Sequence, residues 1–412
     1  MANVSSSNGI EKYPKLRFPE FTDLWKCICI GDVYAERSER GADGAELLSV
    51  TMTEGVKRRS DIEGKDNSSE DKGNYKVVCA GDMVYNSMRM WQGANGISSF
   101  DGIVSPAYTV MTAKQEIANG FFAALFKTHR LISEFARHSQ GMTSDTWNLK
   151  YPQIQTIKTY IPALEEQMKI ADFLVVLDVR IEKQAQLVEC LKKYKRGVSN
   201  KVFNEVHADK DSTIIDFADA FVLLQNNTFS RDCLTIEKTE VLNIHYGDIL
   251  VKYGAMVDPS VDAIPYIREG VDVSKYSSNS YLKNGDVVFA DTAEDYAVGK
   301  VCEIFHADGR KILSGLHTMP FRPTFICAPM YLGYYLNSAA YRVQVLPMIQ
   351  GAKVSSISKS EIRKTKLYVP SLARQQQIVN VLFTLDQRID HAERILEALK
   401  KAKTGLLQHL FV

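Results

Sequence analysis

Several loop segments of this sequence carry side chains that suit contact with a nucleic acid. In the N-terminal half, Arg58 and Arg59 close one apolar stretch, and Arg89, Gln92 and Asn95 follow another. Arginine matches the acceptor edge of guanine, and Asn or Gln matches adenine. Cations and small polar groups hold phosphates without reading sequence. We therefore take these loops as candidate DNA contacts.

The C-terminal half offers similar residue types in its own loops. Gln140 and Gln350 occupy matched positions. Each lies at the end of a segment, 121–141 or 331–351, that is interpreted as one apolar helix ending at Gln-Gly. For any single residue, a polar loop position without contact is the more common outcome, whereas the stretches taken together favour contact. The candidate DNA-binding residues are Arg58, Arg59, Asn86, Arg89, Gln92, Asn95, Gln140, Thr143, Ser144, Lys252, Tyr253, Lys300, Gln350, Lys353 and Ser355.

The loop of the second half that matches the Arg89 loop differs in charge. It contains Asp291, Glu294 and Asp295. Carboxylates repel phosphate, but a carboxylate can accept a hydrogen bond from cytosine. The two halves are therefore expected to read different bases.

No constellation of residues in this sequence supports catalysis. The eight histidines and seven cysteines show no HExxH or CxxC spacing, so no metal site is predicted. The glycines of 93–102 do not form a GxGxxG motif before a helix. The "DIEGK" stretch, Asp61–Lys65, offers carboxylates beside a lysine, yet it lies in a polar run typical of a solvated loop. We predict a chain that is not an enzyme and has no catalytic residue and no metal.

Composition sets further bounds on the class of protein. The chain has 412 residues, 45% of them hydrophobic and 24% charged, with a net charge of +1. This length is enough for roughly two to three domains, and a nucleic-acid surface must be a local patch. No run reaches the length of a membrane span, and the N-terminus has no apolar signal segment. We expect a cytoplasmic protein with no membrane partner.

Two long segments that follow Pro162 and Pro370 position the loops. They repeat one another at an offset of 370 − 162 = 208 residues. In each, mostly apolar residues recur at alternating steps of four and three, which is typical of a coiled coil. One such stripe is too long for a small globule to cover, so the two helices are predicted to pair. The predicted helix-pairing residues are Ile170, Leu174, Leu177, Ile181, Leu191, Ile378, Leu382, Leu385, Ile389 and Leu399.

Basic runs lie near the end of each repeated segment. They are "KKYKRG", 192–197, and "KKAKTG", 400–405. Cations near a helix C-terminus complement the helix dipole. We give this interpretation more weight than contact with a nucleic acid, although the two are compatible.

A fainter repeat precedes each long segment. "AGDMVYNSM", 80–88, resembles "NGDVVFADT", 284–292, and each predicts a turn at Gly-Asp followed by an apolar strand. The chain is therefore divided into a globule at 1–160, a helix at 161–207, a second globule at 208–368 and a second helix at 369–412. The strands and helices are repeated while the loops between them differ, which indicates two modules that share a scaffold and recognise different targets.

The sequence resembles the specificity subunit of Type I restriction–modification systems. The resemblance is carried by "IPALEEQMKIADFLVVLD" and "VPSLARQQQIVNVLFTLD", by the opening "PKLRFPEFTDLWKCICIGDV" and by the closing "KTGLLQHLFV". It covers essentially the whole chain. One departure is that Glu165 and Glu166 of the first repeat are replaced by Ala373 and Arg374 in the second. Any role of these acids in docking a partner therefore does not carry over to the second repeat.

The resemblance implies an α+β fold of two similar mixed α/β domains, each followed by a long helix, with the two helices paired as an antiparallel coiled coil. Each globule would be a target recognition domain for one half of a split double-stranded DNA sequence, and the helices would be the spacer. The partners would be two methyltransferase (modification) subunits, which carry the S-adenosylmethionine, and restriction subunits as optional members. The alternative from a different class is a non-catalytic protein-binding scaffold with a coiled-coil strut.

Overall fold

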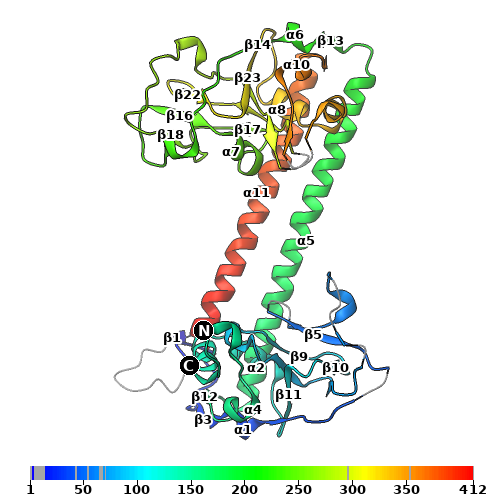
Figure 1. The fold of residues 1–412 in the computed structure, drawn as a ribbon, viewed down its shortest axis with the longest axis vertical. Helices are drawn as coiled ribbons and strands as arrows, with labels where there is room; N and C mark the ends of the chain where they lie inside the picture. The colour runs from blue at the N-terminus through cyan, green and yellow to red at the C-terminus, as the bar shows by residue number, and fades with distance from the viewer. Residues whose placement is uncertain are drawn as a thin grey trace. The chain divides into compact units, whose positions relative to one another are not determined.

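The computed structural model describes residues 2–3, 14–41, 44–52, 55–64, 68–69, 71–294, 297–351 and 354–411. It divides into two compact units, unit 1 (Met1–Gln186 with Glu393–Val412) and unit 2 (Leu187–Ala392). The long helices are α5 (Leu164–Ala208) and α11 (Leu372–His409), both labelled in Figure 1. Each unit therefore contains one globule, the first part of one long helix and the last part of the other.

Unit 1 is built on an antiparallel sheet with strand order β4-β11-β8-β9. These strands span Tyr34–Glu36, Tyr108–Ala113, Met83–Asn86 and Asn95–Ile97. Strand pairs of two add β3 (Lys26–Cys29) with β12 (Lys158–Ile161), β5 (Leu48–Thr51) with β6 (Gly55–Arg58), β7 (Lys76–Val78) with β10 (Gly102–Val104), and β1 (Ala2–Asn3) with β2 (Leu16–Arg17). Because β3 pairs with β12, the last strand of the globule lies beside a strand from its beginning, and α5 starts directly after β12.

The short helices of unit 1 enclose an aromatic core. They are α1 (Ile30–Val33), α2 (Asn119–Leu125), α3 (His129–His138) and α4 (Tyr151–Ile154), with 3-10 turns η1 (Arg59–Asp61), η2 (Met90–Gln92) and η3 (Ser144–Thr146). Phe121 and Phe122 of α2 are buried together with Leu174 of α5. Phe411, just past the end of α11, packs on Phe121 with ring centroids 5.2 Å apart. The last turn of the chain is thus part of the core of the first globule.

Unit 2 repeats this sheet and enlarges it. Its main sheet has the order β14-β23-β19-β21-β17, with strands Phe221–Leu223, Thr318–Pro323, Val287–Ala290, Val301–Ile304 and Met256–Val257. The pair β13 (Thr213–Asp216) and β25 (Lys366–Val369) matches β3 and β12. An additional four-stranded sheet has the order β15-β18-β16-β22, with strands Leu234–Thr235, Tyr266–Ile267, Val241–Ile244 and Lys311–Ser314. The repeat between the two halves of the sequence does not predict this second sheet.

The helices of unit 2 are α6 (Phe217–Ala220), α7 (Tyr246–Val251), α8 (Tyr331–Leu336), α9 (Ala339–Val345) and α10 (Lys359–Ile362). The turns η4 (Arg231–Cys233), η5 (Ser278–Ser280) and η6 (Leu346–Met348) and the pair β20 (Thr292–Ala293) with β24 (Ser355–Ser356) complete the unit. Phe203 of α5 and Leu382 of α11 are buried in its largest apolar cluster. The core of each globule therefore receives one end of each long helix.

The segments 121–141 and 331–351 are each broken into two helices, which corrects the prediction of a single helix. Thr128 lies between α2 and α3, and its hydroxyl accepts a hydrogen bond from the Leu131 amide at the start of α3. Ser338 does the same for the Tyr341 amide at the start of α9. A Ser or Thr hydroxyl that satisfies a free helix amide favours a new N-terminus at that position.

The two Gly-Asp turns have the same construction, as the sequence predicts. The Asp82 carboxylate accepts the Cys79 amide at 2.8 Å, and the Asp286 carboxylate accepts the Lys283 amide at 2.7 Å. Gly81 and Gly285 adopt φ of 94° and 85°, a left-handed conformation that favours glycine. An apolar strand, β8 or β19, follows each turn.

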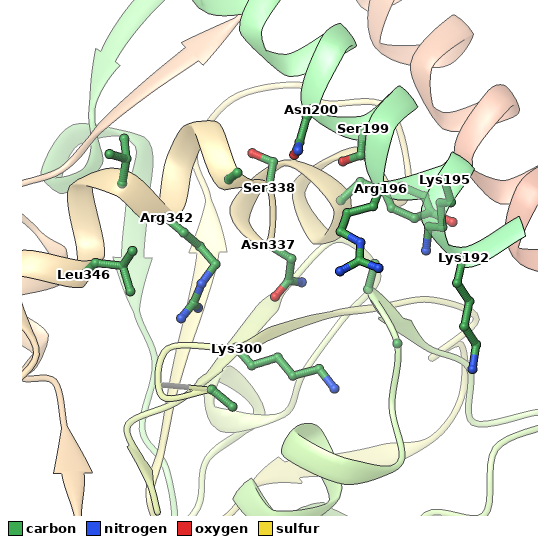
Figure 2. Close-up of a pocket in the computed structure, with 16 residues that line it drawn as sticks. Lys192, Lys195, Arg196, Ser199, Asn200, Lys300, Asn337, Ser338, Arg342 and Leu346 are labelled. Carbon is green, nitrogen blue, oxygen red and sulfur yellow. The ribbon is translucent and has the colours of Figure 1, made fainter. Parts of the chain in front are cut away.

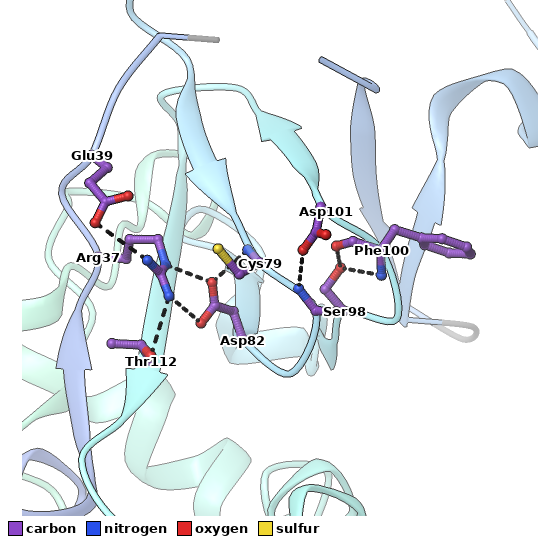
Figure 3. Close-up of polar contacts among 9 residues, drawn as sticks. Arg37, Glu39, Cys79, Asp82, Ser98, Phe100, Asp101 and Thr112 are labelled. Carbon is purple, nitrogen blue, oxygen red and sulfur yellow. Dashed lines mark hydrogen bonds and ion pairs between the residues drawn. The ribbon is translucent and has the colours of Figure 1, made fainter.

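The carboxylate of each turn is neutralised by an arginine from a different strand. Arg37, which follows β4, donates to Asp82 at 2.7 and 3.1 Å (Figure 3). In unit 2, Arg322 on β23 donates to Asp286 at 2.8 and 2.6 Å. The arginine therefore comes from different places in the two globules, after β4 in unit 1 and on β23 in unit 2, but the ion pair with the turn aspartate is present in both.

A glutamine fixes the first turn of each long helix to its globule. Gln167 donates to the Pro162 carbonyl at 2.9 Å and accepts the Ala118 amide at 3.3 Å. Gln375 donates to the Pro370 carbonyl at 2.9 Å and accepts the Ala328 amide at 2.8 Å. The side-chain amides of Gln167 and Gln375 are both buried. This explains why the Pro and Gln recur together at the offset of 208.

The residue before each glutamine makes a different contact in the two units. In unit 1, Glu166 is buried and forms two hydrogen bonds, of 2.8 and 2.7 Å, with Arg17 of the N-terminal segment. In unit 2, Arg374 forms an exposed ion pair with Glu205 of α5 at 2.9 Å. The Glu166 carboxylate is thus occupied inside the chain.

The long helices run antiparallel where they pack together within a unit. In unit 2, Lys195 of α5 pairs with Asp386 of α11, and Glu205 pairs with Arg374. Residue numbers rise along α5 while they fall along α11, which fixes the direction. In unit 1, Lys403 pairs with Asp178, the same ion pair displaced by 208 residues. The predicted fold class, with its antiparallel helix pair, is confirmed.

The predicted pairing residues are shielded from solvent to different degrees. Ile170, Leu174, Ile378, Leu382, Leu385 and Ile389 are buried. Leu177, Ile181, Leu191 and Leu399 are half-buried. Of the predicted pairing residues, those buried lie at 170–174 in α5 and at 378–389 in α11, so a longer part of the stripe is covered in α11.

Candidate nucleic-acid interface

In unit 1, backbone hydrogen bonds bring together two loops that the sequence analysis selected. The Leu149 amide donates to the Ser87 carbonyl at 2.8 Å, and Gln140 and Asn148 exchange bonds of 3.0 and 2.8 Å. The rings of Trp91 and Trp147 meet edge to face, 5.3 Å apart. We name the resulting surface face 1, defined as residues 86–92 and 140–148.

In unit 2, the equivalent bonds join the equivalent loops. The Ile357 amide donates to the Asp291 carbonyl at 2.9 Å, and Gln350 and Ser356 exchange bonds of 2.9 and 2.7 Å. Strands β20 and β24 extend this contact. We name this surface face 2, defined as residues 291–293, 350–351 and 354–356. Leu149 and Ile357 differ by 208 positions, so the frame of the two faces is repeated.

Face 2 is bordered by His317, which the sequence analysis missed. Its backbone φ is 55°, a left-handed conformation that costs a residue with a Cβ about 1–3 kcal/mol and often marks functional positions. Its Nδ1 lies 3.3 Å from a carboxylate oxygen of Asp291 and 3.4 Å from the Thr292 hydroxyl. Tyr246 packs against its ring. No spacing rule in the sequence identifies such a residue.

Most of the candidate DNA-binding residues lie at the surface. Those that are exposed are Arg58, Arg89, Gln140, Thr143, Ser144, Lys252 and Gln350. Those that are half-buried are Arg59, Asn86, Gln92, Lys300 and Ser355. Faces 1 and 2 bring together Asn86, Arg89, Gln92, Gln140, Thr143 and Ser144 in the first unit, and Gln350 and Ser355 in the second.

Some of these surface residues are engaged in local contacts. Arg59 donates to the Ile62 and Gly64 carbonyls at 2.7 and 3.0 Å. Lys252 pairs with Asp248 at 2.9 Å. The guanidinium of Arg58 lies over the ring of Phe100, 4.7 Å from its centroid. Arg59, Lys252 and Arg58 lie outside the two faces as defined.

Two candidates are withdrawn because the structure buries them. Asn95 is 0% exposed, and its amide donates to the Gly93 carbonyl at 3.2 Å. Tyr253 is 4% exposed, and burial raises the pKa of its hydroxyl well above the usual value. Neither side chain can reach a base edge from the interior. Lys353 lies outside the described residues.

Unit 2 also contains a basic cavity of about 950 Å³, drawn in Figure 2. Its cations come from three elements: Lys192, Lys195 and Arg196 from α5, Arg342 from α9, and Lys300 from the loop before β21. The remaining lining residues are small, polar or apolar: Ser199, Asn200, Gly254, Ala255, Ala297, Tyr334, Asn337, Ser338, Ala339, Val343 and Leu346.

Four of these five cations contact groups of the unit, among them Lys192, which lies 3.8 Å from the Glu189 carboxylate. Lys195 pairs with Asp386 and lies over the ring of Tyr334. Lys300 donates to the Leu250 carbonyl at 3.0 Å, and Arg342 donates to the Val298 carbonyl at 3.1 Å. Burial lowers the pKa of Lys300 and of Arg342, because an apolar surrounding disfavours the charged form.

A smaller groove of about 340 Å³ occupies the matching place in unit 1. It lies between α2 and the long helices, and it is lined by Lys127, Lys403 and Asp178. Lys403 and Asp178 pair with each other. The groove therefore carries much less net positive charge than the basic cavity.

Within the described part of the chain, no group of His, Cys, Asp and Glu side chains is arranged to hold a metal ion. Among the same residues, no helix is both long enough and apolar enough to cross a membrane.

The structure thus contains two repeated α+β globules, and each carries a polar face built from the same two loops. The family model of the Type I restriction modification DNA specificity domain matches residues 24–192 and again 234–401. The chain belongs to this family. It is a non-catalytic specificity subunit that recognises DNA and carries no cofactor, since S-adenosylmethionine belongs to the methyltransferase subunit.

Individual relatives agree with this assignment. The MjaVIII Type I restriction enzyme specificity subunit of Methanocaldococcus jannaschii is 23% identical over 341 residues, which cover 78% of this chain and 77% of that protein. The S subunit of M. genitalium superposes with a TM-score of 0.55 at 15% identity, covering 97% of this chain and 99% of the other. The HsdS subunit of Thermoanaerobacter tengcongensis superposes with a TM-score of 0.53 at 16% identity, covering 98% and 99%. These structural similarities establish the fold.

Proposed function

We propose that the chain reads a bipartite DNA target, with one half-site for face 1 and the other for face 2. The observation that carries the proposal is the repeated frame of the two faces. The same loops are joined by the same backbone hydrogen bonds in both units, whereas the side chains on them differ. Two readers of one sequence would not need different side chains.

The chemistry of the faces supports two different half-sites. Face 1 presents Arg89 and Gln140, which suit guanine and adenine, beside the pair of tryptophan rings. Face 2 presents Gln350 together with Asp291, whose carboxylate can accept from the amino group of cytosine. The acidic side chain also disfavours a phosphate at that point, so face 2 would meet base edges there.

We further propose that the chain assembles two modification subunits, one for each unit, and that restriction subunits are optional additional partners. Each unit offers the same combination of helix ends, including the Lys–Asp pair that recurs at the offset of 208. A surface that occurs twice suits two copies of one partner. The assembly would act in the cytoplasm.

Selection of binding sites from random duplexes tests the proposed function. The full chain, assembled with its modification subunit, should enrich two short specified blocks around a stretch without preference. Affinity should fall steeply with salt, because phosphate contacts dominate the sequence-independent part of binding. A single contiguous consensus would contradict the bipartite target. Enrichment of no sequence would favour the alternative, a protein-binding scaffold.

The paired helices are proposed to set the length of the unspecified stretch. Inserting four residues after Gln184 and four after Ala392 adds roughly 6 Å to each helix and turns it by slightly more than one turn. At about 3.4 Å per base pair, the spacer should lengthen by one or two base pairs while both blocks stay the same. Insertions of two residues would rotate the apolar stripes away from each other and abolish assembly. Changed blocks with an unchanged spacer would contradict the proposal.

A further inference from the structure

We propose that the basic cavity of unit 2 is a phosphate site that anchors the DNA backbone next to the half-site read by face 2. The inference rests on the proposed function and adds a specific set of contacts to it. The cavity contributes Lys192, Lys195, Arg196 and Arg342, which the sequence analysis did not include among the candidate DNA contacts, beside Lys300, which it did.

The cavity and face 2 share two stretches of chain. Strand β20 of face 2 is followed, within the same loop, by Ala297 and Lys300, which line the cavity. Leu346, also in the lining, opens the turn η6 that leads to Gln350 of face 2. A duplex whose base edges meet face 2 would therefore have its backbone close to the cavity.

The cations of the cavity are arranged to meet an anion from several sides. Figure 2 shows Arg196, Lys300 and Arg342 entering the cavity from α5, from the loop before β21 and from α9. Lys300 and Arg342 are partly removed from water, which penalises their charged forms. Among the described residues, no carboxylate pairs with Arg196. A phosphate group would stabilise the charged forms of Lys300 and Arg342 and so offset the cost of their burial.

The chemistry of the lining favours phosphodiesters over a carboxylate-bearing partner. The polar part of the lining consists of five cations and of small groups such as Ser199 and Asn200, set in a wall that is otherwise apolar. Lysine, arginine, serine and asparagine are the side chains that position a nucleic-acid backbone without reading its sequence. Its site beside a face that carries base-reading side chains points to the same ligand.

The anchor is specific to unit 2. Repeat-equivalent positions on α11 place Thr404 where Arg196 stands and Gln408 where Asn200 stands. On the short helices, Ile132 of α3 takes the place of Arg342 of α9. The second half-site should therefore be bound with more phosphate contacts than the first.

The test is the salt dependence of DNA binding by the full chain assembled with its modification subunit. The variants are Arg196→Gln and the double variant Lys192→Gln/Arg196→Gln. The matched controls are Lys193→Gln, which removes a cation from the same helix outside the cavity lining, and Lys400→Gln, which removes the repeat-equivalent of Lys192. Thermal unfolding of every variant verifies that it is folded.

Each lost phosphate contact should reduce the slope of log affinity against log salt by about 0.9. We expect a reduction of about one for Arg196→Gln and about two for the double variant, with an unchanged slope for both controls and an unchanged base preference for all. If Arg196→Gln behaves like Lys193→Gln while the parent still prefers its selected site, the phosphate site is wrong and the proposed function stands. If the parent does not distinguish its selected site from a scrambled duplex, the proposed function itself fails.

Discussion

Units 1 and 2 hold their long helices with the same residues and present different residues on their faces. Gln167 and Gln375 make matching hydrogen bonds, and Lys403–Asp178 matches Lys195–Asp386. Among the described residues of the faces, by contrast, the only selected residue that recurs as the same type in the same frame is the glutamine at 140 and 350.

Positions that join a long helix to its globule are the same in both units, whereas exposed loop positions differ, and the two kinds of position face different demands. A residue that fixes a helix to a globule must satisfy buried backbone groups, and few side chains can do so. A residue on an exposed loop is free of this demand and can follow the base that it contacts. The junctions themselves also differ at some positions. Glu166 pairs with Arg17 in unit 1, whereas the equivalent Arg374 pairs with Glu205 in unit 2.

The largest difference in stability between the units is expected for a charge introduced into the apolar stripe along which α5 and α11 pack. Leu385 is 5% exposed, so Leu385→Asp should lower the free energy of unfolding by about 5 kcal/mol, through lost packing and a buried carboxylate. Leu177, its equivalent in unit 1, is only half-buried, so Leu177→Asp should cost less. Urea denaturation of both variants measures the two costs. Equal costs would show that the helix packing around Leu177 shields its side chain as well as the packing around Leu385 does.

The next effect concerns the ion pair that the units do not share. Arg17→Met leaves the buried Glu166 carboxylate without its partner and should destabilise the protein by about 3–5 kcal/mol. Arg374→Met removes only an exposed pair and should cost less than about 1 kcal/mol. The double variant Arg17→Met/Glu166→Leu should regain much of the loss. A small effect of Arg17→Met would mean that the N-terminal segment does not depend on Glu166.

The shared glutamines should give matched losses. Gln167→Met and Gln375→Met each leave a buried carbonyl and a backbone amide, half-buried at Ala118 and buried at Ala328, without a partner, at about 1–3 kcal/mol per group. Gln376→Met changes an exposed neighbour and serves as the control. Chemical denaturation should show similar losses for both buried glutamines and none for the control. A loss for only one would break the equivalence of the two junctions.

The smallest predicted effect depends on pH and belongs to unit 2. His207 donates to or accepts from the Tyr335 hydroxyl at 3.0 Å and stacks on Tyr368, and burial lowers its pKa below the usual value. Because the folded state holds this proton less tightly than the unfolded state, the contribution is present above pH 6.5. It is lost as the pH falls from about 6.5 through the lowered pKa.

The measurement is the urea midpoint at pH 7.5 and pH 5.5 for the parent and for His207→Gln. The parent should lose more stability on acidification than the variant. An identical pH dependence in parent and variant would contradict the role of His207.

The sequence predicts the elements whose signals are local and periodic. The heptad spacing of Leu174 and Leu382 indicates the helix pair, and the Gly-Asp turns at 81 and 285 indicate the strands that follow them. It does not predict contacts between distant residues. Arg17 and Glu166 are separated by 149 positions, and nothing in either segment indicates their pairing.

The sequence selected both loops of each face as polar stretches after apolar elements, and the structure joins them. Their contact with DNA stays a prediction. Asn95 resembles its neighbours in sequence but turns inward, because its amide satisfies a carbonyl of its own loop. His317 became a candidate only through its backbone conformation and its place beside Asp291, which depend on the folded globule.

Binding-site selection with one variant in each face tests the central claim most directly. Arg89 and Gln350 are exposed on faces 1 and 2, so Arg89→Ala and Gln350→Ala should each leave the fold unchanged. The claim that each face reads its own half-site predicts that Arg89→Ala relaxes a base position in one block only. Gln350→Ala should relax a position in the other block only, with the spacer unchanged in both. If both variants alter the same block, or if each alters both blocks, the two faces do not read separate half-sites.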